Sequence, residues 1–235
     1  MSPGNAVLPT HVKSRRKFID HSPGYGGSEL STQTVFIVDD DEAVRDSIKE
    51  LVESAGMAAK TFDGALSFLS ACTGDVPGCL VLDVRMARMS GLALQQRLRE
   101  GNSTMPIVFI SGHGDVDTAV TAIKAGAVDF VQKPYQDQSL LDAINNALEL
   151  DATNRCCADE VTSIRKSIER LTTREKEVLK LLLEGLTNKA IARQLDISPR
   201  TVEVHRRNLL RKFDASSVTE LANMLVHLPG GQVDL

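Results

Sequence analysis

Short apolar runs recur along the first two thirds of the chain. Each run is far shorter than the roughly 20 apolar residues that a helix needs to cross a bilayer. Near-continuous apolar runs of this length are typical of strands in a parallel sheet that is covered on both faces. The pattern therefore predicts five strands, at residues 35–38, 58–62, 79–82, 107–110 and 128–131.

Apolar residues between and after these runs recur three or four positions apart, which is the spacing of one face of a helix. The spacing is clear within 44–55, 92–98, 116–123 and 140–148. Strands that alternate with helices predict a doubly wound α/β domain of the flavodoxin-like type with a five-stranded parallel sheet over residues 34–150. Ligands of such sheets bind beyond the carboxyl ends of the strands.

The pattern changes after residue 170, where no strand-like alternation remains and helix signals follow one another. Thr172 has Glu175 three residues later, as in a capping box. Thr187 and Ser198 are good N-caps, and Pro199 suits a first helical turn. Residues 171–228 are therefore expected to form an all-α domain of four helices, with the last from about 217 to 228.

Three segments lie outside these two domains. Residues 1–33 are rich in Ser, Gly and Pro and lack an apolar segment after their basic cluster, so we expect a disordered extension rather than a signal peptide. Residues 151–170 are polar without Gly or Pro, so we expect a helical linker, while the sequence leaves open whether it is one continuous helix. Residues 229–235 form a short C-terminal tail.

Composition narrows the class of protein. The chain of 235 residues is 42% hydrophobic and 25% charged, which is typical of soluble globular proteins. Four cysteines do not make a disulfide scaffold, and Cys156 and Cys157 lack the spacer of a metal-binding pair. We expect a reduced, cytoplasmic protein that does not contact membranes, in which Cys79 is a small buried hydrophobe.

The net charge of −4 hides an asymmetry between the two domains. Residues 33–150 carry 9 Lys and Arg against 17 Asp and Glu, a net charge of −8. Residues 171–228 carry 10 against 7, a net charge of +3. The acidic part suits a cation and the basic part suits nucleic acid, although solvated surfaces are also charged.

Polar residues follow the predicted strands at one edge of the sheet. Asp39 and Asp40 follow the first strand, Asp83 the third, Ser111 the fourth and Lys133 the fifth. Three clustered carboxylates are costly unless a cation neutralises them, and an all-oxygen site with open positions suits Mg²⁺. Acidic residues also terminate strands without any function, but five polar residues at one edge favour a site.

This set of side chains fits phosphoryl transfer. A carboxylate can act as a nucleophile toward a phosphoryl group. Mg²⁺, the Lys133 ammonium and the Ser111 hydroxyl would neutralise and orient the phosphoryl oxygens. The residues therefore predict an aspartyl-phosphate site that depends on Mg²⁺.

Four segments of the first domain resemble receiver domains of the FixJ branch: V-F-I-V-D-D-D-E, L-V-L-D-V-R-M, F-I-S-G-H-G-D and A-V-D-F-V-Q-K-P. The resemblance implies that Asp83 is the phosphoacceptor. It also implies that Asp39, Asp40, Asp83 and the backbone carbonyl of Arg85 hold Mg²⁺.

The same resemblance assigns the remaining receiver residues. Ser111 takes the switch-hydroxyl role, Lys133 binds phosphate, and Phe130 matches the aromatic residue whose packing changes on activation. Ala87 departs from the family, which usually has Pro in R-M-P-x-M-S-G. This departure bears on the rigidity of the loop after Asp83.

The third helix of the second domain, 199–213, has two faces. Its apolar face is expected to pack on the preceding helices and comprises Val202, Leu209, Leu210 and Phe213. Its other face suits the major groove, since Arg reads guanine, Glu accepts from cytosine and Val contacts the thymine methyl group. The candidate DNA contacts on this helix are Arg200, Thr201, Glu203, Val204, Arg207 and Arg211.

Three residues at the start of the preceding helix, Thr187, Asn188 and Lys189, are candidates for phosphate contacts through side chains and free backbone N–H groups. A solvated charged face would explain the same pattern without DNA.

The stretch L-T-x-R-E-x-E-V-L-x-L-L-x-E-G-L-T-N-K-x-I-A-x-x-L-x-I-S-x-R-T-V-E-V-H resembles the LuxR/FixJ-type helix-turn-helix. The resemblance makes 199–213 the recognition helix and implies a dimer formed partly through the last helix. The apolar stripe of Leu221, Met224 and Leu225 on that helix could equally be core. Together the two domains resemble the NarL/FixJ family of response regulators.

This resemblance implies a transcription regulator that a cognate sensor histidine kinase phosphorylates. Phosphorylation would promote a homodimer that binds double-stranded promoter DNA with inverted-repeat sites, and an activator would also contact RNA polymerase. No enzymatic activity is expected beyond its own phosphorylation and dephosphorylation.

Two rival classes remain open at this point. A haloacid-dehalogenase-type enzyme would have a second Asp two residues after the nucleophile, where this chain has Arg85. A regulator controlled without phosphate would use its receiver only for dimerisation, although all the phosphorylation residues are present.

Overall fold

The computed structural model describes residues 33–72, 74–112, 116–226 and 228. The predicted C-terminal tail and all of the predicted N-terminal extension except Gln33 lie outside these residues.

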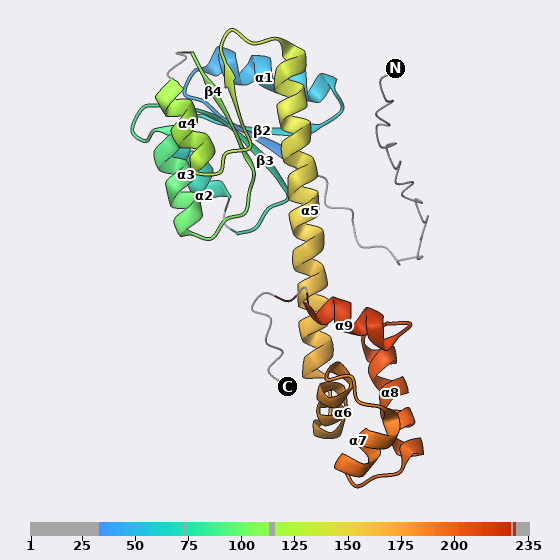
Figure 1. The fold of residues 1–235 in the computed structure, drawn as a ribbon. Coiled ribbons are helices and arrows are strands. Elements are labelled where there is room, and N and C mark those ends of the chain that lie inside the picture. The colour runs from blue at the N-terminus through green and yellow to red at the C-terminus, as the bar shows by residue number, and fades with distance from the viewer. Residues whose placement is uncertain (1–32, 73, 113–115, 227, 229–235) are drawn as a thin grey trace, which may run out of the picture. The chain divides into compact units, whose positions relative to one another are not determined.

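A five-stranded, fully parallel sheet with strand order β2-β1-β3-β4-β5 forms the centre of the N-terminal domain (Figure 1). This order confirms the doubly wound α/β class. Each strand lies within one residue of its predicted bounds, since the apolar runs were unambiguous. The strands are β1 (Thr34–Val38), β2 (Ala58–Phe62), β3 (Gly78–Asp83), β4 (Ile107–Ser111) and β5 (Asp129–Gln132).

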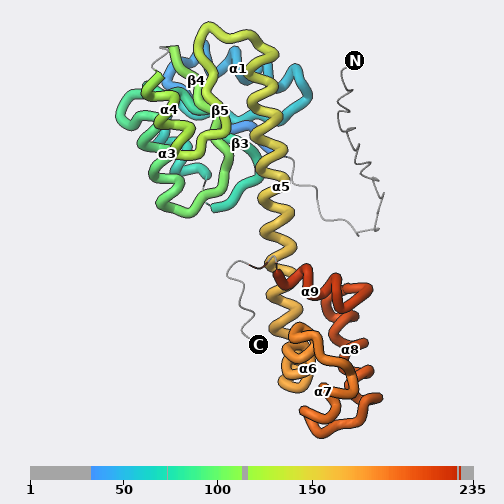
Figure 2. Tube along the Cα trace, in the orientation of Figure 1, coloured from blue at the N-terminus to red at the C-terminus, as the bar shows by residue number. Residues whose placement is uncertain are grey.

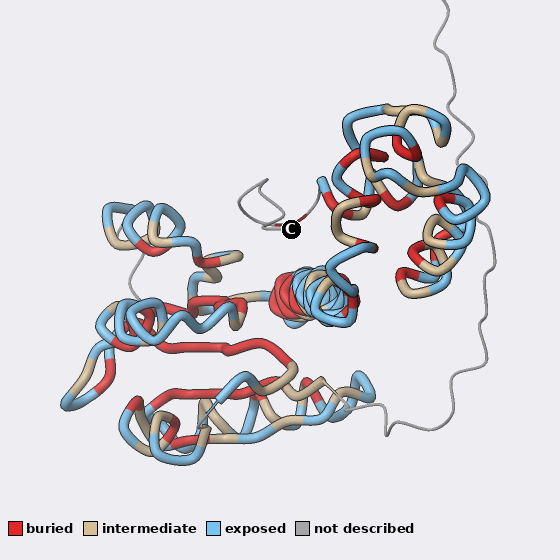
Figure 3. Tube along the Cα trace, turned by 90° about the horizontal axis from the view of Figure 1, so that it is seen from below, coloured by how far each residue is buried: buried red, intermediate tan, exposed pale blue. Residues whose placement is uncertain are grey.

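Two hydrophobic layers cover the sheet because side chains alternate between its faces. On β1, Val35 and Ile37 pack with α1 and α5, whereas Phe36 and Val38 pack with α2 and α3. Figure 3 shows how buried positions concentrate in the strands. The flanking helices are α1 (Glu42–Ser54), α2 (Ala65–Ala71), α3 (Gly91–Glu100), α4 (Val116–Lys124) and α5 (Asp137–Glu169).

Two helices differ from the sequence pattern. The periodicity did not indicate α2, which has seven residues and no side-chain N-cap hydrogen bond. In contrast, α5 extends through the predicted linker and ends at Glu169. The helical expectation for that segment is therefore confirmed through Glu169, whereas Arg170 is its C-cap.

Four further helices follow α5 in the described residues (Figure 2). The first three begin at the predicted cap residues. The side chains of Thr172, Thr187 and Ser198 accept hydrogen bonds from the first turns, and Thr172 and Glu175 form the expected capping box. The last helix is slightly shorter than predicted. The helices are α6 (Thr173–Leu183), α7 (Asn188–Gln194), α8 (Pro199–Lys212) and α9 (Val218–Val226).

These four helices share one hydrophobic core, to which Ile164 of α5 also contributes. As predicted, the apolar face of α8 belongs to this core, with Val202 and Leu209 fully buried. Leu221 and Leu225 of α9 are buried in the same core. Of the two interpretations of the α9 stripe, core packing is therefore the correct one for these two residues.

The described ranges contain no helix with both the length and the apolar character of a membrane span. All four cysteines are free thiols. Cys79 is fully buried in β3, and burial raises the pKa of its thiol to about 12, as expected for a small core residue rather than a reactive one.

An ion pair between a buried carboxylate and a half-buried ammonium joins α6 to α8. The Glu175 carboxylate accepts hydrogen bonds from the backbone N–H of Thr172 at 2.8 Å and from the Lys212 ammonium at 2.6 Å. Lys212 also donates to the carbonyl of Arg170 at 2.8 Å. Burial opposes ionisation of Glu175, but the bonds from Lys212 and Thr172 outweigh it and lower the pKa of Glu175 below its ordinary value.

We predict that Glu175→Gln lowers the free energy of unfolding of the C-terminal domain at pH 7 by about 1 to 3 kcal/mol, because a buried charge-assisted bond is lost. A lowered pKa stabilises the fold above the unfolded value near 4.5, and this contribution disappears as pH falls through the folded pKa. The variant should therefore lose less stability on acidification. Hydrogen exchange of α6 peptides at pH 7 and in acid measures both effects.

Glu177→Gln is the matched control, because the Glu177 side chain is 41% exposed and pairs with Arg174. It should cost below about 0.5 kcal/mol. If both variants lose the same free energy of unfolding, the Glu175–Lys212 pair stabilises the domain no more than a surface pair does.

Candidate functional site

The parallel sheet brings polar residues from four strands to one edge. Asp39 follows β1, Asp83 ends β3, Ser111 ends β4 and Lys133 follows β5. The registers pair Asp83 with Ile110 and Ser111 with Gln132, so these strand ends lie level with one another. The predicted site residues of these strands therefore meet at the carboxyl edge.

Lys133 lies at the centre of this edge. Its ammonium donates to Asp39 Oδ2 at 2.8 Å and to Asp83 Oδ1 at 2.9 Å. Its backbone N–H donates to the carbonyl of Ser111 at 2.7 Å, which fixes the start of the β5–α5 loop against β4. The Lys133 ammonium thus bridges two carboxylates that follow or end neighbouring strands.

The other oxygens of these carboxylates are held by backbone N–H groups. Asp39 Oδ1 accepts from Asp41 at 2.9 Å, and Asp83 Oδ2 accepts from Arg85 at 2.7 Å. Asp39 is 1% exposed and Asp83 is 7% exposed, so both carboxylates are buried, and these hydrogen bonds fix their orientation.

Burial and neighbouring charges shift the pKa values of Asp83 and Lys133. Burial raises the pKa of Asp83, and neighbouring Asp39 raises it further, against the lowering effect of Lys133 and of the Arg85 N–H. Burial alone would lower the pKa of Lys133, but its bonds to Asp39 and Asp83 raise it above the ordinary value. Lys133 is therefore firmly charged at neutral pH.

The third acidic residue, Asp40, is exposed and is held differently. Its Oδ2 accepts a hydrogen bond from the backbone N–H of Ala87 at 2.8 Å. A proline at this position has no N–H and could not donate this bond. The departure from the family pattern thus ties the loop after Asp83 to Asp40, a contact that the sequence analysis missed and that only the departure at Ala87 could have signalled.

The same loop contains a tight turn. Met89 N–H donates to the carbonyl of Ala87 at 2.8 Å, and the intervening Arg88 has φ +68°. Positive φ is uncommon for a residue other than glycine, and such strain persists only where neighbouring contacts hold the backbone. The Ala87–Asp40 bond is one such contact.

The donor set fits a hard divalent cation. In the described part of the chain, no group of three acidic, His or Cys side chains is already arranged as a metal site. Lys133 neutralises one of the three negative charges, and the excess that remains attracts a further cation. The available donors are oxygens, which Mg²⁺ prefers. Arg85 supplies its N–H to Asp83 here, so the role of its carbonyl stays a prediction.

Two predicted switch residues lie next to this cluster. Ser111 is buried, at 3% exposure, and Phe130 of β5 is half-buried. The Phe130 ring lies 6.5 Å from that of Phe109 on β4, at an interplanar angle of 32°. Phe130 therefore belongs partly to the core and partly to the surface, which is a suitable position for a side chain that changes packing.

The candidate DNA face lies on α8. Val204 is 48% exposed despite being apolar, and the charged side chains around it are also exposed. The buried residues Val202 and Leu209 lie on the opposite side of the helix. The exposed predicted contacts are Arg200, Thr201, Glu203, Val204, Arg207 and Arg211.

Residues at the start of α7 are also accessible. Thr187 and Lys189 are exposed and Asn188 is partly exposed. Thr187 Oγ1 accepts from the N–H of Ala190 at 3.4 Å, so this hydroxyl caps the helix. Its predicted phosphate contact would compete with or add to this capping role.

Comparison with known proteins agrees with this arrangement. The family model described as the response regulator receiver domain matches residues 35–145. The model described as bacterial regulatory proteins of the luxR family matches residues 169–225.

Relatives match along most of the chain. The chain is 44% identical over 214 residues to the response regulator protein TmoT of Ectopseudomonas mendocina, covering 90% of this chain and 97% of TmoT. It is 42% identical over 193 residues to the transcriptional regulatory protein FixJ of Bradyrhizobium diazoefficiens, covering 81% of this chain and 93% of FixJ.

A solved structure of the response regulator StyR superposes with a TM-score of 0.75 at 43% identity, covering 83% of this chain and 98% of StyR. The fold agrees with that of StyR, and the two family models match the two domains. The chain therefore belongs to the NarL/FixJ family of response regulators, transcription regulators with a receiver domain and a LuxR-type DNA-binding domain.

Proposed function

We propose that Asp83 accepts a phosphoryl group from a cognate sensor histidine kinase and that this promotes dimerisation and sequence-specific promoter binding. The observation that carries the proposal is the bridge from the Lys133 ammonium to Asp39 and Asp83, because it holds the Asp83 carboxylate at the carboxyl edge of the sheet beside a fixed positive charge. The transfer forms a bond between phosphorus and an Asp83 oxygen. It breaks the bond between phosphorus and the kinase imidazole nitrogen, which takes up a proton.

Each neighbouring residue has a part in this step. Asp39, Asp40, Asp83 and the Arg85 carbonyl would hold Mg²⁺, which neutralises charge on the phosphoryl oxygens. Lys133 binds a phosphoryl oxygen, and Arg85 N–H orients the Asp83 carboxylate. Ser111 donates its hydroxyl to another oxygen of the group.

The proposed switch follows from crowding of charge. A phosphoryl group adds about 1.5 to 2 negative charges beside Asp39 and Asp40. Drawing Ser111 and Lys133 toward it satisfies the new oxygens, and Phe130 turns inward to fill the space that Ser111 leaves. A local change of charge thus becomes a change in packing at the surface of β5.

Dimerisation would use the face made by α4 and β5. On α4, Val116 is 72% exposed, and Val120 and Ile123 are each 44% exposed, which is an unusual density of apolar surface for a short helix. Two receivers joined there would bring two α8 helices to half-sites of an inverted repeat about one helical turn apart. Contact with RNA polymerase would follow if the protein is an activator.

The phosphoacceptor assignment predicts that Asp83→Asn abolishes acid-labile labelling that depends on Mg²⁺, because an amide is not a nucleophile toward phosphorus. Asp63→Asn is the matched control, since Asp63 also follows a strand at this edge but is exposed and hydrogen-bonded to Ser67 of α2. It should be labelled normally with a small phosphoryl donor. Normal labelling of Asp83→Asn would place the site elsewhere.

The assignment of DNA contacts predicts that two basic side chains, Arg207 and Lys189, affect DNA binding differently. Arg207→Ala should cost about 1 to 3 kcal/mol of binding and relax specificity at one base pair. Lys189→Ala should weaken binding to all sequences alike and reduce the slope of log affinity against log salt by about one. Binding to a selected site and to point variants of it, measured at several salt concentrations, separates these effects.

Lys180→Ala on the exposed surface of α6 is the control and should change neither quantity. If Arg207→Ala and Lys189→Ala behave alike, the division between base contact and phosphate contact is wrong.

The dimer proposal predicts that Val120→Arg keeps the phosphorylated chain monomeric, because it places a charge in the apolar face of α4. Labelling of Asp83 should be unchanged. Leu66→Arg on α2 is the control, since Leu66 is similarly exposed at 49% but lies outside that face. Sedimentation of the full chain with and without phosphoryl donor measures the mass, and a wild-type chain that stays monomeric when phosphorylated contradicts the proposal.

A further inference from the structure

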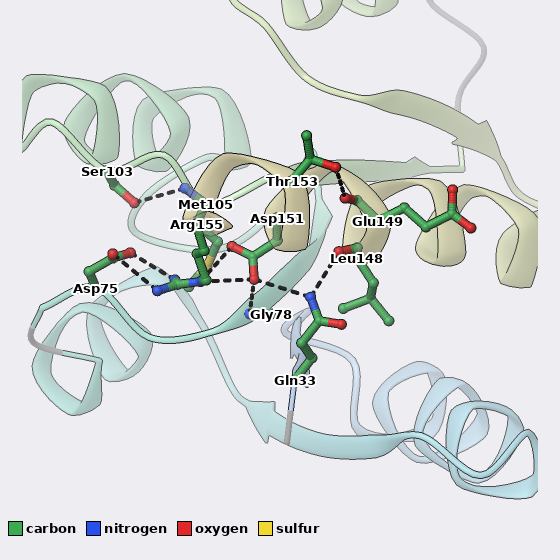
Figure 4. Close-up of polar contacts among 10 residues, drawn as sticks. All are labelled: Gln33, Asp75, Gly78, Ser103, Met105, Leu148, Glu149, Asp151, Thr153 and Arg155. Carbon is green, nitrogen blue, oxygen red and sulfur yellow. Dashed lines mark hydrogen bonds and ion pairs between the residues drawn. The ribbon is translucent and has the colours of Figure 1, made fainter. Parts of the chain in front are cut away.

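A polar cluster ties α5 to the receiver at the far end of β3 from Asp83 (Figure 4). Its centre is Asp151, which lies one residue beyond the predicted receiver boundary and is 1% exposed. The carboxylate accepts hydrogen bonds from the backbone N–H of Gly78 at 2.9 Å and from Gln33 Nε2 at 3.3 Å. Arg155 Nε donates to both of its oxygens at 3.0 Å.

Arg155 extends this cluster to a second carboxylate. Its Nη1 and Nη2 donate to the two oxygens of Asp75 at 3.1 and 2.8 Å, a bidentate pair in which both bonds run in parallel. The Asp75 side chain is 68% exposed, the Arg155 side chain 23% and the Asp151 side chain 1%. One guanidinium therefore joins a buried carboxylate to an exposed one.

The backbone at Gly78 is adapted to this contact. Gly78 has φ +140°, and a Cβ atom there would lie 1.9 Å from the carbonyl oxygen of Thr34. A residue other than glycine would therefore push β1 and β3 apart. Gly78 therefore allows β1 and β3 to approach closely at the point where the Gly78 N–H donates its hydrogen bond to Asp151.

The adjacent part of α5 also borders the receiver. Ala158 lines a cavity of about 540 Å³ together with residues of α2, α3 and the loop before β4. Residues 156–160 are all exposed, and Val161 and Ile164 then pack with the core of α6 to α9. The segment 156–160 is thus part of a longer stretch of α5, residues 149–160, that contributes to none of the three hydrophobic cores.

We propose that Asp151, Arg155 and Asp75 form a clamp that makes the first turns of the linker part of the receiver. The buried half, Asp151 with Gly78, fixes the helix to β3. The exposed half, Arg155 with Asp75, keeps α5 helical as it enters the segment 156–160 and so determines how firmly this segment follows the receiver.

The two halves of the clamp are expected to contribute unequally to the stability of this part of α5. Loss of the Arg155 charge leaves the buried Asp151 carboxylate without a cation, which is costly. Loss of the Asp75 charge removes only the exposed half of the pair, whose contribution is small because water screens it. The clamp therefore predicts graded loosening of α5 rather than an all-or-none effect.

Amide hydrogen exchange of the full chain tests the clamp directly. In Arg155→Gln, amides of residues 150–158 should exchange at least about tenfold faster, which corresponds to about 1.4 kcal/mol. In Asp75→Asn, the acceleration should be about two- to fivefold. The controls Arg165→Gln and Asp159→Asn make the same changes at exposed positions of α5 and should leave these amides unchanged.

Two results would overturn the clamp. The first is equal exchange of these amides in Arg155→Gln and Arg165→Gln. The second is equal exchange of these amides in Asp75→Asn and Asp159→Asn, a comparison that remains available if Arg155→Gln does not fold, because Asp75 is a surface residue.

A second readout concerns signalling and rests on the proposed function. Asp75→Asn should be phosphorylated like the wild type, but the ratio of DNA affinities with and without phosphoryl donor should fall at least about threefold. A wild-type chain that shows no such ratio would contradict the proposed function and leave the exchange result standing. An unchanged ratio in Asp75→Asn, with a normal wild type, would reject the role of the clamp in signalling.

Discussion

The bridge from Lys133 to Asp39 and Asp83 is the interaction on which the receiver site depends. Two nearly buried carboxylates at adjacent strand ends repel each other, and burial of each is unfavourable without a partner. The ammonium stabilises both, while Arg85 and Asp41 hold their second oxygens through backbone N–H groups. This arrangement holds two carboxylates and one ammonium in fixed orientations at the carboxyl edge, which is where parallel sheets bind their ligands.

The strand β3 connects this edge to the linker. All six of its residues, Gly78 to Asp83, are buried. Its first residue binds Asp151 of α5 and its last is the proposed phosphoacceptor. Close-packed buried strands deform little, so β3 holds two polar clusters at a fixed separation. One is the proposed phosphorylation site, and the other contains the hydrogen bond from Gly78 to Asp151 of α5.

The C-terminal domain is organised by a different principle. Its core is separate from the two layers of the receiver, and its helices are fixed by side-chain caps and by the Glu175–Lys212 pair. Burial of one face of α8 leaves its other face exposed, including the apolar Val204. The exposure of the proposed DNA-contacting face is thus a consequence of how α8 packs.

The sequence by itself determined the strands, the cap residues of α6 to α8, the two faces of α8 and the residues at the strand ends, because each is a local or periodic pattern. Only the tertiary structure decided the pairing of those residues. The bonds from Lys133 to Asp39, from Ala87 to Asp40 and from Gly78 to Asp151 span 94, 47 and 73 positions of the chain. Such contacts depend on strand order, register and loop conformation, and no local pattern of residues encodes these.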